Sequence, residues 1–176
     1  MTLSQFEKLK KFKTASFALW NDSPKKFQDI ECIKKNIKNL HARVIILGLN
    51  PSSRVKINFL ENFHKLGRGS RDRWYVKAFK NEPFCGVYMT DLIYHAETKA
   101  SKIILRWRGE NFRKDNIKNL KEQFKILKTK KPIIVCIGKN TYNEYVRFKK
   151  DLPVFSNLFF IKNPNGYRKK GREINL

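Results

Sequence analysis

The sequence predicts an α/β protein, a three-layer α/β/α sandwich built on a mainly parallel four-stranded sheet. Runs of β-forming residues alternate along the chain with amphipathic helical patterns, as in βαβ units. Two runs, 44–49 and 158–161, are apolar without polar alternation, which is typical of strands buried on both faces. Each of these runs stops at an Asn-Pro pair, beginning at Asn50 and Asn163. Because proline cannot continue a hydrogen-bonded ladder, each strand should end there.

The first half of the chain predicts helices followed by one strand and a long loop. Ser4 and Glu7 fit a capping box, and apolar residues then recur every three or four positions. A long connection inside a small domain is usually functional. In order, we expect a helix over ~4–20, a helix over ~27–39, a strand over 43–48, a loop over ~50–70 and a short helix over ~72–80.

The second half repeats the alternation of strand and helix. One longer helix is predicted by apolar residues at three- and four-residue spacing, and Asn140 is a candidate cap for another. We expect a strand over 86–89, a loop over ~92–110, a helix over ~112–129, a strand over 133–137, a helix over 140–148 and a strand over 158–161. With 176 residues, the chain (1–176) should form a single domain whose N-terminal helices occupy about 1–40.

Charge is the dominant compositional feature. The chain has 39 Lys and Arg against 15 Asp and Glu, a formal net charge of +24. Such an imbalance indicates a polyanionic partner, although lysine-rich helix faces that only contact solvent are the simpler alternative. Because the basic residues are spread over the whole chain, nucleic acid fits better than a membrane surface.

The cysteines and the N-terminus exclude several classes of protein. Cys32, Cys85 and Cys136 form no C-x-x-C pair, so neither a disulfide scaffold nor a zinc or iron–sulfur site is indicated. We expect no metal and no cofactor. The N-terminus has no long apolar run, which argues against a signal peptide or membrane span. A cytoplasmic monomer is the expected form.

The two Asn-Pro ends point to a shared site. If both strands run parallel in one sheet, Asn50 and Asn163 lie at the same edge. Open α/β sheets bind ligands beyond the carboxyl ends of their strands. Two amides distant in sequence would then converge on one crevice.

With these ends placed, the chain from about 43 to 171 resembles the uracil-DNA glycosylase superfamily. Gly48-Leu49-Asn50-Pro51 looks like its first motif, in the Asn form of the mismatch-specific uracil/thymine glycosylases. Asn163-Pro164-Asn165-Gly166-Tyr167 looks like its second motif. The helix–strand–Gly unit within 112–145 is also similar. The runs 62–64 and 90–92 resemble uncharacterised bacterial members.

The resemblance implies a protein that binds DNA and hydrolyses the N-glycosidic bond of an abnormal base. That reaction needs an extruded base, a positioned water and stabilisation of the leaving base. By the resemblance, Asn50 would orient the water and Asn163 would stand where the strongest members have a His. An amide can orient water but is no strong base. Each Asn could instead simply cap its turn.

The resemblance also implies a base-binding group. Phe63 is the candidate for stacking on the extruded base, with a core Phe as the alternative. His64 is either a site residue or a loop hydrogen-bonding group. Thr90 and Asp91 follow the second strand, where the uracil-reading members have an Asn. An ionised Asp91 only accepts hydrogen bonds, so it would suit a base edge with an amino group, such as cytosine N4, unless it faces elsewhere.

DNA contacts are expected from the C-terminal segment and from hydroxyls near strand ends. By the resemblance Tyr167 would wedge into the duplex, and the adjacent cations would hold phosphates. A disordered basic tail and simple loop polarity are the alternatives. The candidates are Ser52, Ser53, Ser101, Tyr167, Arg168, Lys169 and Lys170. The DNA could be duplex or single-stranded. The rival functions are a non-catalytic nucleic-acid-binding module and a nucleotide- or small-molecule-binding α/β protein.

Overall fold

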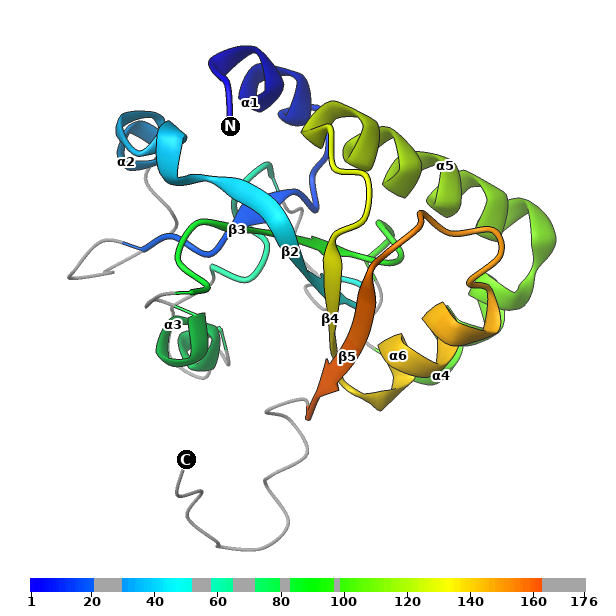
Figure 1. The fold of residues 1–176 in the computed structure, drawn as a ribbon. Helices are drawn as coiled ribbons and strands as arrows, with labels where there is room; N and C mark the ends of the chain where they lie inside the picture. The colour runs from blue at the N-terminus through cyan, green and yellow to red at the C-terminus, as the bar shows by residue number, and fades with distance from the viewer. Residues whose placement is uncertain (21–29, 52–57, 65–71, 80–82, 97–98, 163–176) are drawn as a thin grey trace, which may run out of the picture.

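A computed structural model describes residues 1–20, 30–51, 58–64, 72–79, 83–96 and 99–162 (Figure 1). Within these residues, five strands form one sheet in the order β1-β3-β2-β4-β5. The strands are β1 (Ser16–Phe17), β2 (His41–Gly48), β3 (Val87–Asp91), β4 (Ile133–Ile137) and β5 (Asn157–Ile161). The helices are α1 (Leu3–Leu9), α2 (Ile30–Lys35), α3 (Arg73–Phe79), α4 (Ala100–Arg108), α5 (Glu110–Leu127) and α6 (Lys139–Arg147), with a 3₁₀ turn at Ile37–Asn39.

Four of the five strands run parallel, so their carboxyl ends lie along one edge. β2 pairs in parallel with both β3 and β4, and β4 pairs in parallel with β5. The short β1 pairs antiparallel with β3. The strands that precede Asn50 and Asn163 therefore end at the same edge, with β4 between them.

One face of the sheet is covered by helices α1, α4, α5 and α6. Side chains of alternate strand residues, such as Ile45, Leu47 and Cys136, join buried residues of these helices in the larger core cluster. In Figure 1, α4, α5 and α6 lie together on one side of the strands, and α3 lies on the other side.

The opposite face carries a smaller core. There Ile46 and Met89 pack with Phe79 of α3 and with Phe63 from the loop after β2. The predicted α/β/α class is thus confirmed, with helices flanking both faces of a mainly parallel sheet.

The predicted helix over ~4–20 is wrong beyond its first turns. α1 ends at Leu9, and Ser16–Phe17 instead form β1, a fifth strand that the sequence did not predict. A two-residue strand has no periodicity to read, and its pairing with β3 outweighs the local helical pattern. The capping box is also two residues earlier than expected, between Thr2 and Gln5.

The loop predicted over ~92–110 is wrong as well, because it contains α4. Its N-cap, Lys99, makes no side-chain capping bond, so the usual start signal is missing. Ile103 and Trp107, four residues apart, are fully buried and fix the helix against the sheet. The cap of α6 is Gly138, with a φ of 86°, and not Asn140. None of the helices in the described ranges is both long and apolar enough to cross a bilayer.

Candidate active site

The segments that follow β2 and β3 run side by side at the carboxyl edge. The backbone N–H of Leu92 donates to the carbonyl of Gly48 (2.9 Å), and that of Ile93 donates to Leu49 (3.0 Å). This pairing holds Asn50 and Asp91 at neighbouring strand ends. The Asn50 amide donates to the carbonyl of the next residue, Pro51 (2.9 Å), so this side chain is hydrogen-bonded within the Asn-Pro segment. Asn163 lies outside the described residues.

Asp91 is buried at the end of β3 and is held from two sides. Its Oδ2 accepts a hydrogen bond from Asn62 Nδ2 (2.8 Å), and the same nitrogen donates to the Thr14 carbonyl (3.1 Å). Its Oδ1 occupies the space above Gly48, only 2.0 Å from where a β-carbon would lie. Any side chain at position 48 would displace this carboxyl group, which gives a physical reason for glycine there.

Burial changes the acidity of Asp91. Loss of water around the carboxyl group raises the pKa of Asp91 to about 7, against the opposing effect of the Asn62 hydrogen bond. The nearby charge of Asp72 raises the pKa further. Near neutral pH the group is therefore split between an ionised form, which only accepts hydrogen bonds, and a neutral form, which also donates.

Phe63 lies against the same glycine. Its ring atom Cζ is 3.0 Å from the position of a Gly48 β-carbon, and its ring meets Tyr75 edge-on at a centroid distance of 5.4 Å. Phe63 is 8% exposed and adopts a φ of 65°, while Leu60 in the same loop has a φ of 72°. Left-handed backbone in non-glycine residues costs about 1–3 kcal/mol each and tends to occur at functional sites.

His64 lies deeper, packed on Trp20. The two rings are 4.8 Å apart between centroids, and within the described residues neither ring nitrogen of His64 forms a well-aligned hydrogen bond. Burial lowers the pKa of His64 to about 3, despite a small opposite effect from the Phe17 backbone. His64 is therefore neutral at physiological pH and does not supply a positive charge.

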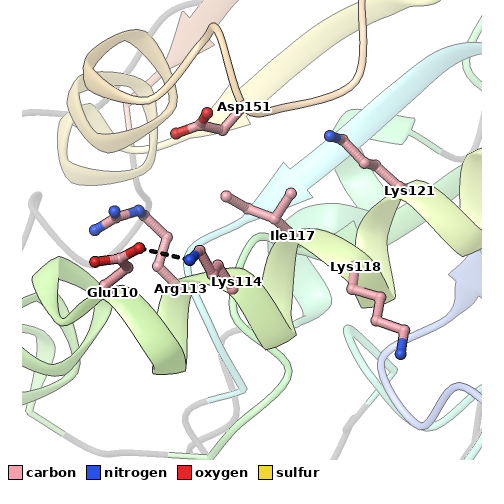
Figure 2. Close-up of a pocket in the computed structure, with 7 residues that line it drawn as sticks. All are labelled: Glu110, Arg113, Lys114, Ile117, Lys118, Lys121 and Asp151. Atoms are coloured by element: carbon pink, nitrogen blue, oxygen red, sulfur yellow. Dashed lines mark ion pairs between the residues drawn. The ribbon is translucent and has the colours of Figure 1, made fainter.

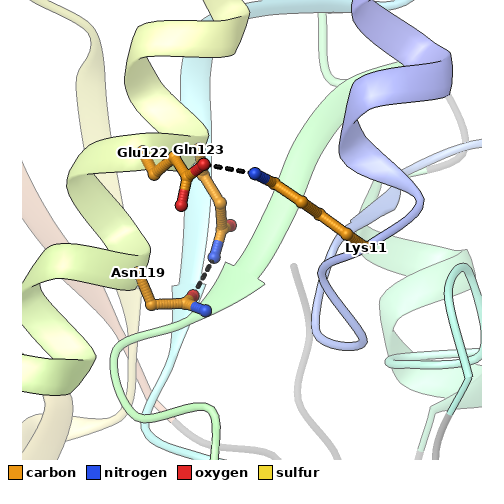
Figure 3. A network of polar contacts seen from close by, with 4 residues as sticks. All are labelled: Lys11, Asn119, Glu122 and Gln123. Carbon is orange, nitrogen blue, oxygen red and sulfur yellow. Dashed lines mark hydrogen bonds and ion pairs between the residues drawn. The ribbon is translucent and has the colours of Figure 1, made fainter.

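Thr90 points to the opposite face of the sheet from Asp91. Its hydroxyl donates to Gln123 Oε1 (2.9 Å) and lies 3.1 Å from the Thr14 hydroxyl. Tyr88 donates to the same Gln123 oxygen (2.7 Å). Figure 3 shows that the Gln123 amide nitrogen in turn donates to Asn119. Thr90 is thus part of a buried network that ties α5 to β3.

The structure brings together part of the predicted set. Phe63 and Asp91 both lie over Gly48 at the carboxyl edge, Asn50 follows two residues after this glycine, and His64 packs on Trp20. Ser101 is exposed in the first turn of α4. The other predicted DNA-contacting residues lie outside the described part of the chain: Ser52, Ser53, Tyr167, Arg168, Lys169 and Lys170.

Sequence reasoning missed the residues that hold Asp91 in place. Asn62 is adjacent to Phe63 and was noted only as part of a motif, and Thr14 was assigned to a helix. A polar residue next to the candidate stacking aromatic was a usable signal for Asn62. Nothing local marks Thr14, whose contacts depend on the antiparallel pairing of β1.

Among the described residues, no three His, Cys, Asp or Glu side chains are arranged to hold a metal ion. Cys136 is buried in β4, and burial raises the pKa of its thiol to about 12. It is therefore a core residue and not a reactive thiolate.

A comparison with known protein families matched most of the chain. The family model described as "Uracil DNA glycosylase superfamily" matches residues 35–173. The chain therefore belongs to the uracil-DNA glycosylase superfamily. Neither the curated proteins nor the solved structures gave a match.

Proposed function

We propose that this protein is a DNA glycosylase that hydrolyses the N-glycosidic bond of an abnormal base. Family membership supports a glycosylase-like function. The observation that carries the proposal is the meeting of Asp91 and Phe63 over Gly48, two residues before Asn50. This arrangement lies inside the matched region, at the sheet edge where α/β folds bind ligands.

In the proposed reaction, water adds its oxygen to C1′ of the deoxyribose as the bond from C1′ to the base nitrogen breaks. The bonding electrons leave with the base, and the proton released by the water neutralises it. Asn50 orients the water through its amide and removes no proton itself. Phe63 supplies an aromatic face for the extruded base. The Asn form of the motif at Asn50 favours the mismatch-specific branch of the superfamily.

Asp91 would read the edge of the extruded base. In its ionised form the carboxylate accepts from an amino group such as cytosine N4, and in its neutral form it also donates to a carbonyl oxygen such as uracil O4. With a pKa of about 7, both forms exist near neutral pH. The base preference should therefore change with pH, toward carbonyl-bearing bases below pH 7 and toward amino-bearing bases above it.

A panel of oligonucleotides tests the proposal. Each would carry one modified base, in duplex and single-stranded form, and excision would be measured as alkali-labile strand breaks. We expect the parent protein to excise one or a few of these bases, and the Asn50→Ala variant to lose this excision. DNA binding without excision of any base would instead identify a non-catalytic DNA-binding module.

A further inference from the structure

Five exposed lysines form a straight stripe along the outer face of α5, extending to its C-cap. Their spacing of four, three, four and three residues keeps them within about a quarter of the helix circumference. At about 1.5 Å per residue the stripe is about 21 Å long. It consists of Lys114, Lys118, Lys121, Lys125 and Lys128, called the lysine stripe below.

Most of this charge is not compensated by the protein. Lys114 pairs with Glu110, but the other four lysines form no ion pair with a described residue. The nearby Glu122 pairs instead with Lys11, just after the end of α1 (Figure 3). Like charges three or four residues apart destabilise a helix by about 0.2–0.5 kcal/mol per pair. The lysine stripe therefore lowers the stability of α5 unless an external anion binds it.

A groove of about 460 Å³ lies beside the N-terminal half of the lysine stripe. Figure 2 shows Ile117 between the lysines, with Asp151 on the far side. Four basic side chains and only two acidic ones line it: Glu110, Arg113, Lys114, Lys118, Lys121 and Asp151, in addition to Ile117. The groove adds room for an anionic chain next to the stripe.

The lysine stripe lies on a helix that covers the opposite face of the sheet from Phe63. Leu120 and Phe124 of α5 pack into the core on one face of the sheet, whereas Phe63 belongs to the core on the other face. The helix also runs away from the site, since Thr129, just after it, bonds to Ala42 near the start of β2. A straight duplex lying at the carboxyl edge cannot also follow the lysine stripe.

We propose that the lysine stripe binds the phosphate backbone of a second DNA segment, separate from the segment held at the candidate active site. This inference rests on the proposed function only for the identity of the polyanion. A 21 Å length of B-DNA axis presents about six phosphates on each strand, enough to engage the five lysines. Lysines are flexible point charges, so the binding is independent of sequence.

DNA fits the lysine stripe better than an anionic membrane does. A helix that lies in a lipid interface inserts an exposed apolar face. The apolar residues of α5, such as Leu120 and Phe124, are buried against the sheet. Within the described residues, none of the exposed large hydrophobic side chains belongs to α5.

The test compares two full-length variants of equal charge. One carries Lys→Gln at four positions of the lysine stripe: Lys118, Lys121, Lys125 and Lys128. The control carries Lys→Gln at four exposed lysines elsewhere: Lys8, Lys13, Lys35 and Lys38. Glutamine has a helix propensity close to that of lysine, and circular dichroism would verify the fold of both variants.

The protein would first be bound to an immobilised short duplex that carries one modified base from the panel above. Capture of a second, labelled duplex would then be measured as a function of salt concentration. We expect the lysine-stripe variant to lose at least about tenfold in capture, with a salt slope lower by about 3–4 units. The control should keep its capture, and excision on a single short duplex should stay within about twofold for both.

Equal loss of capture in both variants, or no capture by the parent protein, would overturn the inference. So would loss of binding to vesicles rich in anionic lipid while duplex capture stays intact, because the partner would then be a membrane. Base excision is measured in a separate assay from duplex capture, so that the two proposals can fail independently. Capture without excision of any base refutes the proposed glycosylase function and supports the lysine-stripe inference.

Discussion

Thr90 and Asp91 are neighbours in sequence, yet they serve two very different polar clusters. Thr90 points into a network around Gln123 in which the hydroxyls of Tyr88 and Thr90 are hydrogen-bonded. Asp91 points to the other face, toward Phe63. There, within the described residues, the His64 ring nitrogens and Trp20 Nε1 form no well-aligned hydrogen bond.

The difference teaches that one strand end can carry a satisfied polar network on one face and a buried carboxyl group with a raised pKa on the other. A satisfied buried network holds α5 on β3 and specifies the fold. A buried carboxyl group with a raised pKa, beside left-handed backbone, lowers stability and is typical of functional sites. Four predictions test this division, from the largest expected effect to the smallest.

The largest effect is expected for Asn50→Ala. Loss of one preorganised polar group costs about 10²–10³ in rate, whereas the basic surface that supplies DNA affinity is unchanged. Single-turnover excision and duplex binding, measured on the same preparation, would show a lower excision rate with unchanged DNA affinity. Excision as fast as that of the parent would remove Asn50 from the reaction.

Asp91→Asn should raise stability at alkaline pH. The pKa of Asp91 is raised from 3.8 to about 7 on folding, so the folded protein binds this proton more tightly than the unfolded chain. Its contribution to the free energy of unfolding is therefore lost as pH rises through 4–7. The loss is about 4 kcal/mol at most, from about 1.4 kcal/mol per pKa unit.

The asparagine variant retains an acceptor for Asn62 and has no such loss. Urea unfolding at pH 5 and pH 8 would measure the free energy of unfolding of both proteins. The gain in stability of the variant over the parent should be larger at pH 8 than at pH 5. Its preference among bases should also become independent of pH. A parent protein whose base preference does not change between pH 6 and pH 8.5 would contradict the proposed role of Asp91 as the reader of the base.

Gln123→Leu should destabilise the fold and leave the chemistry intact. The variant leaves the hydroxyls of Tyr88 and Thr90 buried without their shared acceptor, at about 1–3 kcal/mol for each unpaired group. Excision per folded molecule should stay close to that of the parent. A variant that folds normally but loses excision would show that this network acts on the site as well.

His64→Phe should have the smallest effect at neutral pH, within about 1 kcal/mol, because an apolar ring replaces one whose nitrogens lack partners. The pKa of His64 falls from 6.5 to about 3 on folding. The parent therefore loses stability as pH falls below 6.5, and the variant should resist acid better. Thermal melts at pH 7.5 and pH 5 would compare the two. A large loss at pH 7.5 would indicate a hydrogen-bonded role for His64.

Much of this fold was predictable where a pattern was long enough to read. The strand at 133–137 was predicted with its observed bounds, because a buried apolar run after Pro132 has few alternatives. β1 and α4 were missed, since a two-residue strand and an uncapped helix depend on tertiary contacts. At the site, motif positions predicted that Phe63 and Asp91 lie near the end of β2, whereas the roles of Asn50, Phe63 and Asp91 stay predictions. The direction of Thr90 and the support from Thr14 depend on strand pairing, which no single segment encodes.

The pairing of β1 with β3 has a consequence for how the chain folds. Ser16 pairs with Met89, so the first strand of the sheet leaves the ribosome long before its partner. The region matched by the family model begins at residue 35, after β1 and after Thr14, which bonds to Asn62 beside Asp91. Pairing between residues so distant in sequence slows folding. Until β3 has been synthesised, β1 remains exposed to proteases and chaperones. A truncated variant limited to the matched region would lack the strand that covers the edge of β3, and Asp91 would lose part of its support.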